Sequence, residues 1–229
     1  MIPRIAIVPT HNRPVELARL LDSLATQCHA VFVVDNASDP PVTLPEWHPN
    51  REVLGMRQIV IRDEEQPPNL SRLWNVGLDA AAEYTRGGDY VGHDVGVFND
   101  DADVPPGWWD IVSAGLRGHP TAAVCCTPAY APIAGPLLKT KPDGDLWGRM
   151  TPWAFVTRGE VGLRADERMR WWWFDSDWDF RARAAGGVLT VPGPTVANTG
   201  ANSSTVGVLA EQAGRDRATF VEIHGSAPW

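Results

Sequence analysis

The chain has 229 residues, enough for one large domain with a substantial core but short of two ordinary domains. Hydrophobic residues make up 44% and charged residues 21%, as in globular proteins, and no apolar run is long enough to span a bilayer. The net charge of −8 disfavours a sequence-independent grip on nucleic-acid backbone. Because the chain opens on a strand-like segment instead of a signal sequence, we expect a cytoplasmic protein without integral membrane association.

The first part of the chain alternates strand-like and helix-like segments. Residues 5–8 are apolar and β-rich, and leucines at helical spacing follow over residues 17–24. Residues 31–34 form a second apolar run, as expected of a parallel strand covered on both faces. Residues 58–61 predict a third strand, and residues 69–84 predict a helix with one apolar stripe.

A fourth strand is predicted over residues 95–98, and the chain is less regular after it. Residues 122–126 and 154–157 are typical of strands, and the stretch 131–152 of a loop rich in Gly and Pro. The alternation predicts an α/β fold in which helices flank a mostly parallel, Rossmann-like sheet. Such sheets bind ligands beyond the carboxyl ends of their strands, where this sequence places polar clusters.

Three carboxylates crowd the end of the fourth predicted strand, at Asp100, Asp101 and Asp103. Carboxylates this close repel one another unless a cation or hydrogen-bond donors neutralise them, so a divalent metal is the economical explanation. Such an ion would bridge the phosphates of a nucleoside diphosphate and act as a Lewis acid on the departing group. The alternative is a solvated acidic turn before a helix that begins near Gly107.

Several motifs, taken in order, resemble the inverting glycosyltransferases of the large family 2, which have the GT-A fold. Residues 8–14 (VPTHNRP) are similar to the family's opening turn, and residues 34–39 (VDNASD) to its second-strand motif. Residues 98–108 (FNDDADVPPGW) are similar to its D-x-D region and the Pro-Gly-Trp that often follows. A rhamnosyltransferase-like subgroup is one alternative within the family.

The resemblance implies a single GT-A domain over residues 1–229. Residues 1–103 would form the half that binds the nucleotide sugar, and residues 104–229 the less regular half that binds the acceptor and carries the catalytic base. A UDP-sugar is the favoured donor, with dTDP- and GDP-sugars as alternatives. The acceptor would bear a hydroxyl group, and its class is left open.

The resemblance also implies donor-binding residues. Asp35 would accept a hydrogen bond from the nucleotide base, and Arg72 would contact a phosphate or the base from a helix that closes over the nucleotide. The residues expected to bind the donor are Pro9, Thr10, His11, Asn12, Arg13, Asp35, Asn36, Arg72, Asn75 and Asp100.

Two registers are open for the metal ligands of the D-x-D region. Counting back from Pro-Gly-Trp selects Asn99 and Asp101, whereas literal spacing selects Asp101 and Asp103. Asp101 belongs to both and is expected to bind Mn²⁺ or Mg²⁺. Many relatives add a His after the acidic motif described next, and His224 is the only His beyond that motif. It is therefore a third expected ligand, with an exposed residue as the alternative reading.

Residues 175–183 (DSDWDFRAR) resemble the acidic motif that opens a helix in this family, and Asp177 aligns with its catalytic base. A sugar hydroxyl that attacks the anomeric carbon must lose its proton, and one carboxylate within reach can take it. This chain departs from the family pattern by having Ser176 where Glu is usual. The structural alternative is a helix cap at Asp175 or Ser176, with Asp179 paired to Arg183.

Tryptophan is unusually frequent, with 11 residues. The rings at residues 171–173 directly precede the acidic motif and suit an acceptor platform, with a buried strand as the alternative. Trp147 and Trp153 flank a stretch that would order over the acceptor.

The function predicted from the sequence is metal-dependent, inverting transfer of a sugar to a hydroxyl acceptor, with Asp177 as general base. One alternative is a catalytically silent module that binds a nucleotide or a carbohydrate. A nucleotidyltransferase is less favoured, because the Gly-rich phosphate loop expected after the first strand is absent.

Overall fold

Strand β1 (Arg4–Thr10) lies at the centre of the fold, because it is apolar on both faces and is paired on both sides. Strands β2 (Ala30–Asn36) and β4 (Asp94–Phe98) flank it in parallel and are fully buried, and β3 (Arg57–Asp63) pairs in parallel with β2. These strands are seen in a computed structural model that describes residues 2–43, 56–88, 90, 92–143, 149–199 and 208–227.

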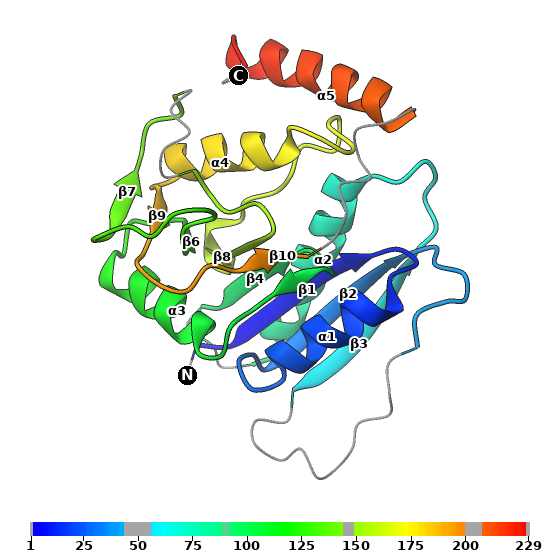
Figure 1. Cartoon of the computed structure of the whole chain (residues 1–229), viewed down its shortest axis with the longest axis horizontal. Coiled ribbons are helices and arrows are strands. Elements are labelled where there is room, and N and C mark those ends of the chain that lie inside the picture. Colours follow the sequence, from blue (N-terminus) through cyan, green and yellow to red (C-terminus); the bar gives the residue numbers. More distant parts are fainter. Residues whose placement is uncertain are drawn as a thin grey trace.

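The sheet continues beyond β4 with β8 (Ala154–Arg158), β6 (Val124–Cys126), β9 (Val188–Thr190) and β7 (Leu137–Lys139), as Figure 1 shows. Strands β6 and β9 are parallel to each other, whereas β8 and β7 run antiparallel to their neighbours. These eight strands therefore form a mostly parallel sheet. Because β8 runs against β4, its first residue lies at the edge where β4 ends.

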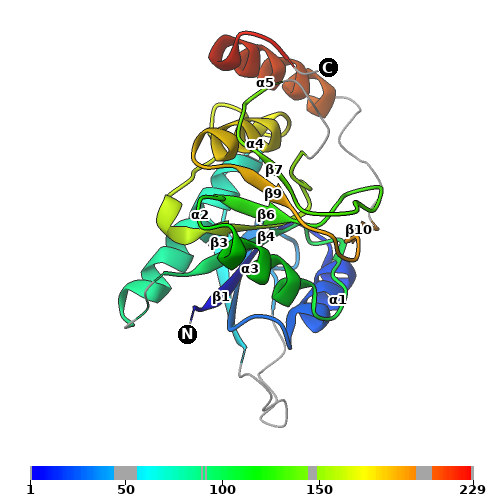
Figure 2. The same cartoon turned by 90° about the vertical axis from the view of Figure 1, so that its left-hand side faces the viewer.

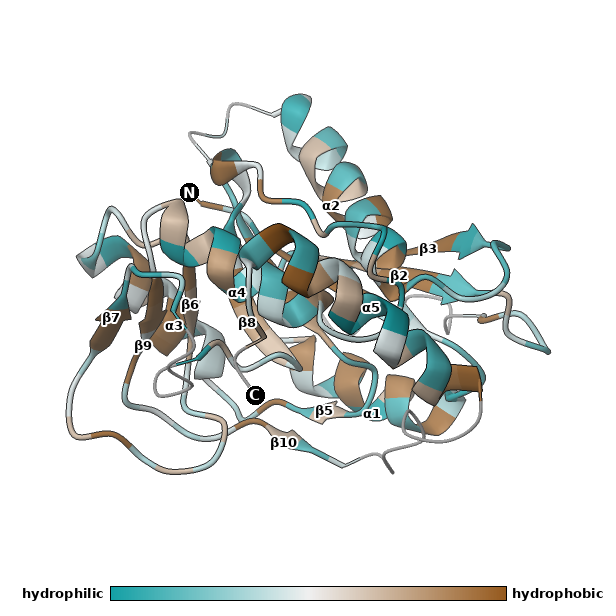
Figure 3. Cartoon of the chain, turned by 90° about the horizontal axis from the view of Figure 1, so that it is seen from above, coloured by the Kyte–Doolittle hydropathy of each residue, from teal (hydrophilic) through white to brown (hydrophobic). Residues whose placement is uncertain are grey.

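Helices cover both faces of the sheet (Figures 1 and 2). Apolar side chains of α1 (Pro14–Leu24) and α3 (Trp108–Gly118) pack on one face, and those of α2 (Leu70–Arg86) and α4 (Phe174–Ala184) pack on the other. Helix α5 (Val208–His224) lies outside α4. Figure 3 shows strands β6 and β9 as largely hydrophobic, whereas α2 and α5 carry many hydrophilic residues.

Three short elements complete the described fold. Strands β5 (Ala102–Asp103) and β10 (Ala197–Asn198) pair antiparallel with each other, and a 3₁₀ turn spans Gly159–Val161. In the described part of the chain, no helix is both long and apolar enough to cross a membrane. Fold class is thus as expected: α/β, with helices flanking a mostly parallel sheet.

The predicted strands and helices of the first half are confirmed, with Asn69 as the N-cap of α2. Strand β7 was predicted as loop, because three half-exposed residues after a Pro give little periodic signal. Residues 171–173 are not a strand: Trp173 has a φ of 67° and precedes α4 directly. Since α4 begins at Phe174, Asp175 lies in its first turn and not at the cap. Trp147 lies outside the described residues.

Candidate functional site

The polar ends of three neighbouring parallel strands meet at one edge of the sheet. Thr10 ends β1 and is paired in register with Asp35 of β2. Strand β4 ends at Phe98, two residues before Asp100. The Thr10 hydroxyl donates a hydrogen bond to Asp100 Oδ2 at 2.8 Å. The structure thus brings the end of β1 into contact with the acidic cluster after β4.

Arg13 is the cation that faces this acidic cluster. Its Nη1 lies 2.7 Å from Asp101 Oδ2 and 3.3 Å from Asp100 Oδ1. Burial raises the pKa of Asp100, and the hydrogen bond from Thr10 and the charge of Arg13 offset that effect only in part. Burial acts to lower the pKa of Arg13, but Asp100 and Asp101 together raise it above its ordinary value. Asp100, Asp101 and Arg13 are therefore one electrostatic unit.

Asp101 has an oxygen that the described residues leave unused. Its side chain is only 7% exposed, and no described group hydrogen-bonds its buried Oδ1. Two carboxylates face one guanidinium here, and a buried carboxylate oxygen without a partner is costly. The donor set at this point, a hard anionic oxygen in a region of excess negative charge, fits a divalent cation.

The other two expected metal ligands lie apart from this oxygen. Asp103 is exposed on β5, where it pairs with Ala197 of β10. His224 lies near the end of α5 and directs Nε2 to Asp177. Among the described residues, no three His, Cys, Asp or Glu side chains converge into a metal-binding group. The expected set of Asp101, Asp103 and His224 is not assembled, because packing of α5 on α4 commits His224 to a different carboxylate.

The turns after β1 and β2 are tied together by hydrogen bonds. His11 Nδ1 lies 2.6 Å from the Asn36 carbonyl oxygen. The Asn12 backbone N–H donates to Ser38 Oγ at 2.9 Å, and the Asp39 N–H donates to Asn12 Oδ1 at 2.8 Å. Both His11 and Asn12 are exposed, whereas neighbouring Pro9 is buried. His11 and Asn12 are thus available to a ligand at this edge.

Asp35 is fully occupied by its own loop. Its Oδ1 accepts from the Ser38 N–H at 3.0 Å, and its Oδ2 accepts from the Val42 N–H at 3.2 Å and from Arg62 Nη1 at 2.6 Å. Burial acts to raise the pKa of Asp35, but bonds from Ser38, Arg62 and Val42 outweigh it and lower the pKa. With its side chain 1% exposed, Asp35 offers no free oxygen to a nucleotide base in this arrangement. Its role here is to hold the loop after β2.

Asn36 and Arg72 meet at the end of β3. Arg72 Nε lies 3.1 Å from Asp63 Oδ2 and 2.8 Å from Glu65 Oε2, and its side chain is 40% exposed. Asn36 Nδ2 donates to the carbonyls of the same two residues, at 3.4 and 3.3 Å. No described group hydrogen-bonds the buried Oδ1 of Asn36. Among the expected donor contacts, Asn36 thus has a buried oxygen without a described hydrogen bond, and Arg72 has exposed surface that a ligand can reach.

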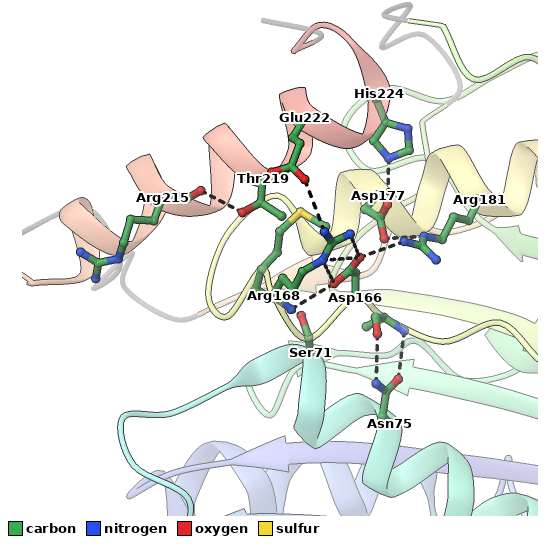
Figure 4. A network of polar contacts seen from close by, with 12 residues as sticks. Ser71, Asn75, Asp166, Arg168, Asp177, Arg181, Arg215, Thr219, Glu222 and His224 are labelled. Carbon is green, nitrogen blue, oxygen red and sulfur yellow. Dashed lines mark hydrogen bonds and ion pairs between the residues drawn. The ribbon is translucent and has the colours of Figure 1, made fainter.

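Asn75 joins the two halves of the chain instead of facing the strand ends. Its Nδ2 donates to the Ala165 carbonyl at 3.0 Å, and its Oδ1 accepts from the Ala165 N–H at 2.9 Å. Figure 4 shows it below the network around Asp166 and Arg168. We conclude that Asn75 fixes the segment leading to α4, a role that its place in the donor set did not predict.

Asp177, the expected base, is sealed between α4 and α5 (Figure 4). Its side chain has no exposed surface, and its Oδ1 lies 2.8 Å from His224 Nε2. Its Oδ2 forms an ion pair with Arg181 Nε at 2.7 Å, although the angle falls outside hydrogen-bond geometry. Both oxygens are therefore engaged by cationic or polar partners, and neither faces solvent.

Asp175 is the more open carboxylate of the same motif. Its side chain is 15% exposed, and its Oδ2 accepts from Arg149 Nη2 at 2.6 Å. Arg149 belongs to the segment that enters β8, where the Met150 N–H donates to Asp179 Oδ1 at 2.8 Å. Asp179 is paired with Arg183 at 2.7 Å, the i, i+4 pair expected from the sequence.

Neither Asp175 nor Arg149 was singled out from the sequence as a catalytic candidate. Successive helical residues turn by about 100°, so the side chains of residues 175 and 177 must leave α4 in nearly opposite directions. This spacing was the signal that only one of the two carboxylates can face the strand ends.

Comparison with protein-family models and with curated proteins finds no match to this chain. Function is therefore inferred from what the described residues can do. The edge of the sheet combines a buried carboxylate pair of excess negative charge, a facing guanidinium, exposed polar side chains after β1, and an arginine-bound carboxylate on α4. This set suits a phosphorylated ligand held through a cation, with a proton acceptor on the neighbouring helix.

Proposed function

We propose that the chain transfers a sugar from a nucleoside-diphosphate sugar to a hydroxyl acceptor with inversion, using Mn²⁺ or Mg²⁺. The observation that carries the proposal is the buried pair Asp100 and Asp101 at the end of β4, with Asp101 Oδ1 left without a partner. A solvated acidic turn would leave these carboxylates exposed, whereas here they are buried against Arg13 and Thr10.

The sheet topology supports a GT-A organisation for this proposal. Four parallel strands in the order β3-β2-β1-β4 end at the candidate donor site, and antiparallel β8 follows in the sheet. Residues before β8 therefore return to the same edge, where the second half of the chain can hold an acceptor. Ligands of such α/β sheets lie beyond the carboxyl ends of the strands.

The donor half would bind the diphosphate through charge. A divalent cation held by Asp101, together with phosphate and water ligands, would neutralise charge on the leaving diphosphate. Arg13 supplies a fixed positive charge beside that position, and Thr10 orients Asp100. The half-exposed Arg72 offers hydrogen bonds to the base or ribose. A UDP-sugar remains the favoured donor, with dTDP- and GDP-sugars as alternatives.

We assign the base to Asp175 instead of Asp177. As the acceptor oxygen bonds to the anomeric carbon, the bond from that carbon to the diphosphate breaks, and the hydroxyl proton must pass to a carboxylate with an accessible oxygen. Asp175 is hydrogen-bonded by Arg149 and by the Ser176 N–H, but its side chain keeps 15% exposed surface, whereas Asp177 is sealed by Arg181 and His224 and has none. Asp177 would then act as a positioning residue that fixes α4 against α5.

A thermal-shift panel tests the proposal. UDP, dTDP, GDP and ADP, each with MnCl₂, MgCl₂ or EDTA, are added to the wild type and to Asp101→Ala. A ligand that binds only the folded state raises Tm according to its concentration and Kd. We expect one nucleotide to raise Tm only with metal, and Asp101→Ala to lose that shift. No shift with any nucleotide would overturn the proposal, whereas a shift without slow hydrolysis of the matching nucleotide sugar would favour the silent binding module.

A further inference from the structure

Tyr130 and Trp153 form an aromatic pair that no element of the proposed donor site uses. Their ring centroids are 5.8 Å apart with planes inclined at 71°, an edge-to-face arrangement. Tyr130 is 87% exposed, the largest exposed fraction among the exposed large hydrophobic side chains of the described residues. This edge-to-face contact leaves most of the tyrosine exposed to a ligand.

Trp153 is fixed firmly enough to serve as the base of a binding surface. Its Nε1 donates to the Val196 carbonyl at 2.8 Å, and its own carbonyl accepts from the Asn99 N–H at 3.0 Å. The next residue, Ala154, is paired in register with Phe98. Trp153 therefore lies on the β8 side of the end of β4, with β4 between it and β1, and next to the residues that lead into Asp100 and Asp101.

The segment that carries Tyr130 returns to the same edge. It follows β6, and Thr127 in it accepts a hydrogen bond from Trp108 Nε1 at 2.8 Å. The Thr151 hydroxyl donates to the Thr127 carbonyl at 2.7 Å, which ties this segment to the one that contains Arg149 and Trp153. The aromatic pair thus shares one edge with the acidic cluster and with Arg149, the partner of Asp175.

The residues around the aromatic pair favour an uncharged sugar ring as its ligand. Residues 127–136 contain no charged side chain, so the segment offers no ion pair to a phosphate or to a nucleic-acid backbone. A sugar ring presents an apolar C–H face to an aromatic ring and hydroxyl groups at its rim. The Tyr130 hydroxyl belongs to a side chain that is 87% exposed, so it can hydrogen-bond such a rim.

We propose that Tyr130 and Trp153 form the acceptor subsite and hold a neutral sugar ring of a glycan acceptor by stacking. This inference rests on the proposed sugar transfer, because a sugar ring bound at this edge is an acceptor only if the donor binds at Asp101 and the base is Asp175. It narrows the acceptor, left open by the sequence, to a carbohydrate. A stacked ring at this edge lies on the β8 side of the donor site, opposite the loop that Asp35 holds.

The test measures ring binding separately from donor binding. Saturation-transfer NMR is recorded with methyl glycosides of glucose, galactose, mannose and rhamnose, and with adenosine, on the wild type, Tyr130→Ala, Tyr130→Phe and Tyr90→Ala. Tyr90 is a matched control, since it is 45% exposed and precedes β4 at the opposite edge of the sheet. Metal-dependent nucleotide binding is measured on all four proteins by thermal shift.

We expect at least one glycoside to bind the wild type, Tyr130→Phe and Tyr90→Ala, and Tyr130→Ala to bind it roughly 3- to 10-fold more weakly, as loss of one aromatic contact predicts. Nucleotide shifts should be equal in all four. Glycoside binding to Tyr130→Ala that is as strong as to the wild type, no glycoside binding to the wild type, or binding of adenosine in place of glycosides would each overturn the subsite. Failure of every nucleotide to bind would instead overturn the proposed function. The glycoside spectra would still show whether Tyr130 contributes to the binding of a sugar ring.

Discussion

His224 Nε2 lies 2.8 Å from Asp177 Oδ1, and this contact joins the last helix to the helix that carries the acidic motif. It is one of three anchors on a single stripe of α5, at spacings of four residues. The other two are Phe220, buried against Trp173 and Phe180, and Asp216, which has no exposed surface. Since residues four apart share one helix face, these side chains hold the second half of α5, from Asp216 to His224.

The strongest anchor is predicted to be Asp216. Its Oδ2 accepts from the N–H groups of Trp171 and Trp172, both at 2.8 Å, and its Oδ1 from the Arg170 N–H at 3.1 Å. We expect Asp216→Asn to lose about 2 kcal/mol of stability, because an amide nitrogen cannot accept the bonds that a carboxylate oxygen accepts. For a chain of this length, Tm should fall by roughly 4–8 °C.

Scanning calorimetry measures this loss. The matched control is Glu222→Gln, which removes an exposed carboxylate of the same helix that lies 3.7 Å from Arg168. That variant should keep a Tm close to that of the wild type. Equal Tm values for Asp216→Asn and Glu222→Gln would show that α5 does not depend on the Asp216 contacts.

Substitution of Asp175 and of Asp177 should have different effects on kcat and on Tm. Asp175→Asn is expected to lower kcat by roughly 10²- to 10⁴-fold without weakening donor binding, as loss of a general base does. Asp177→Asn should keep measurable transfer but lower Tm, because it loses its ion pair with Arg181. Steady-state kinetics and nucleotide thermal shifts on both variants check this. Loss of kcat in Asp177→Asn alone, at unchanged Tm, would return the base to Asp177.

The sequence was sufficient for the central strands and for the meeting of their ends. Apolar runs such as 5–8 and 31–34 end at Pro9 and Asp35, and these local signals do not depend on the rest of the chain. The contact of Thr10 with Asp100 follows directly from three parallel neighbours that end at one edge.

The surroundings of the acidic motif could not be predicted from such local signals, because they depend on residues far away in the sequence. His224 lies 47 positions from Asp177, and α5 was not predicted, since in the described part of this helix Asp216 and Phe220 alone are fully buried. A helix with so narrow a buried stripe has a weak periodic signal. The left-handed backbone of Trp173 likewise depends on packing, as its residue type would favour a strand.

Removal of Arg13 should make the stability of the chain depend on a bound cation. Arg13→Ala leaves the buried Asp100 and Asp101 without their guanidinium, so Tm in EDTA should fall. Added MnCl₂ should then raise Tm more in this variant than in the wild type, because the ion replaces the lost charge. The control is Arg19→Ala, whose side chain contacts Thr199 and not the two carboxylates. Identical MnCl₂ responses in Arg13→Ala and Arg19→Ala would argue against a cation at Asp101.

Asp166 gives a prediction for the pH dependence of stability. Hydrogen bonds from Arg168, at 2.8 Å from Nη2, lower the pKa of Asp166, and the charge of Arg181 adds to the effect. A carboxyl whose pKa is lower in the folded state stabilises the fold at any pH above its unfolded value of about 3.9. That contribution disappears as the pH falls through the lowered folded value.

Asp166→Asn should therefore be less stable than the wild type by about 1 kcal/mol at pH 7, the upper range for a partly exposed pair. The difference should stay constant down to about pH 5 and shrink below about pH 4, where the unfolded carboxyl takes up a proton. Urea unfolding of both proteins, from pH 7 to below about pH 4, measures this stability difference. Asp79→Asn is the control for an exposed pair. A difference that persists undiminished at the acid end would mean that Asp166 stabilises the fold through packing or neutral hydrogen bonds, and not through its charge.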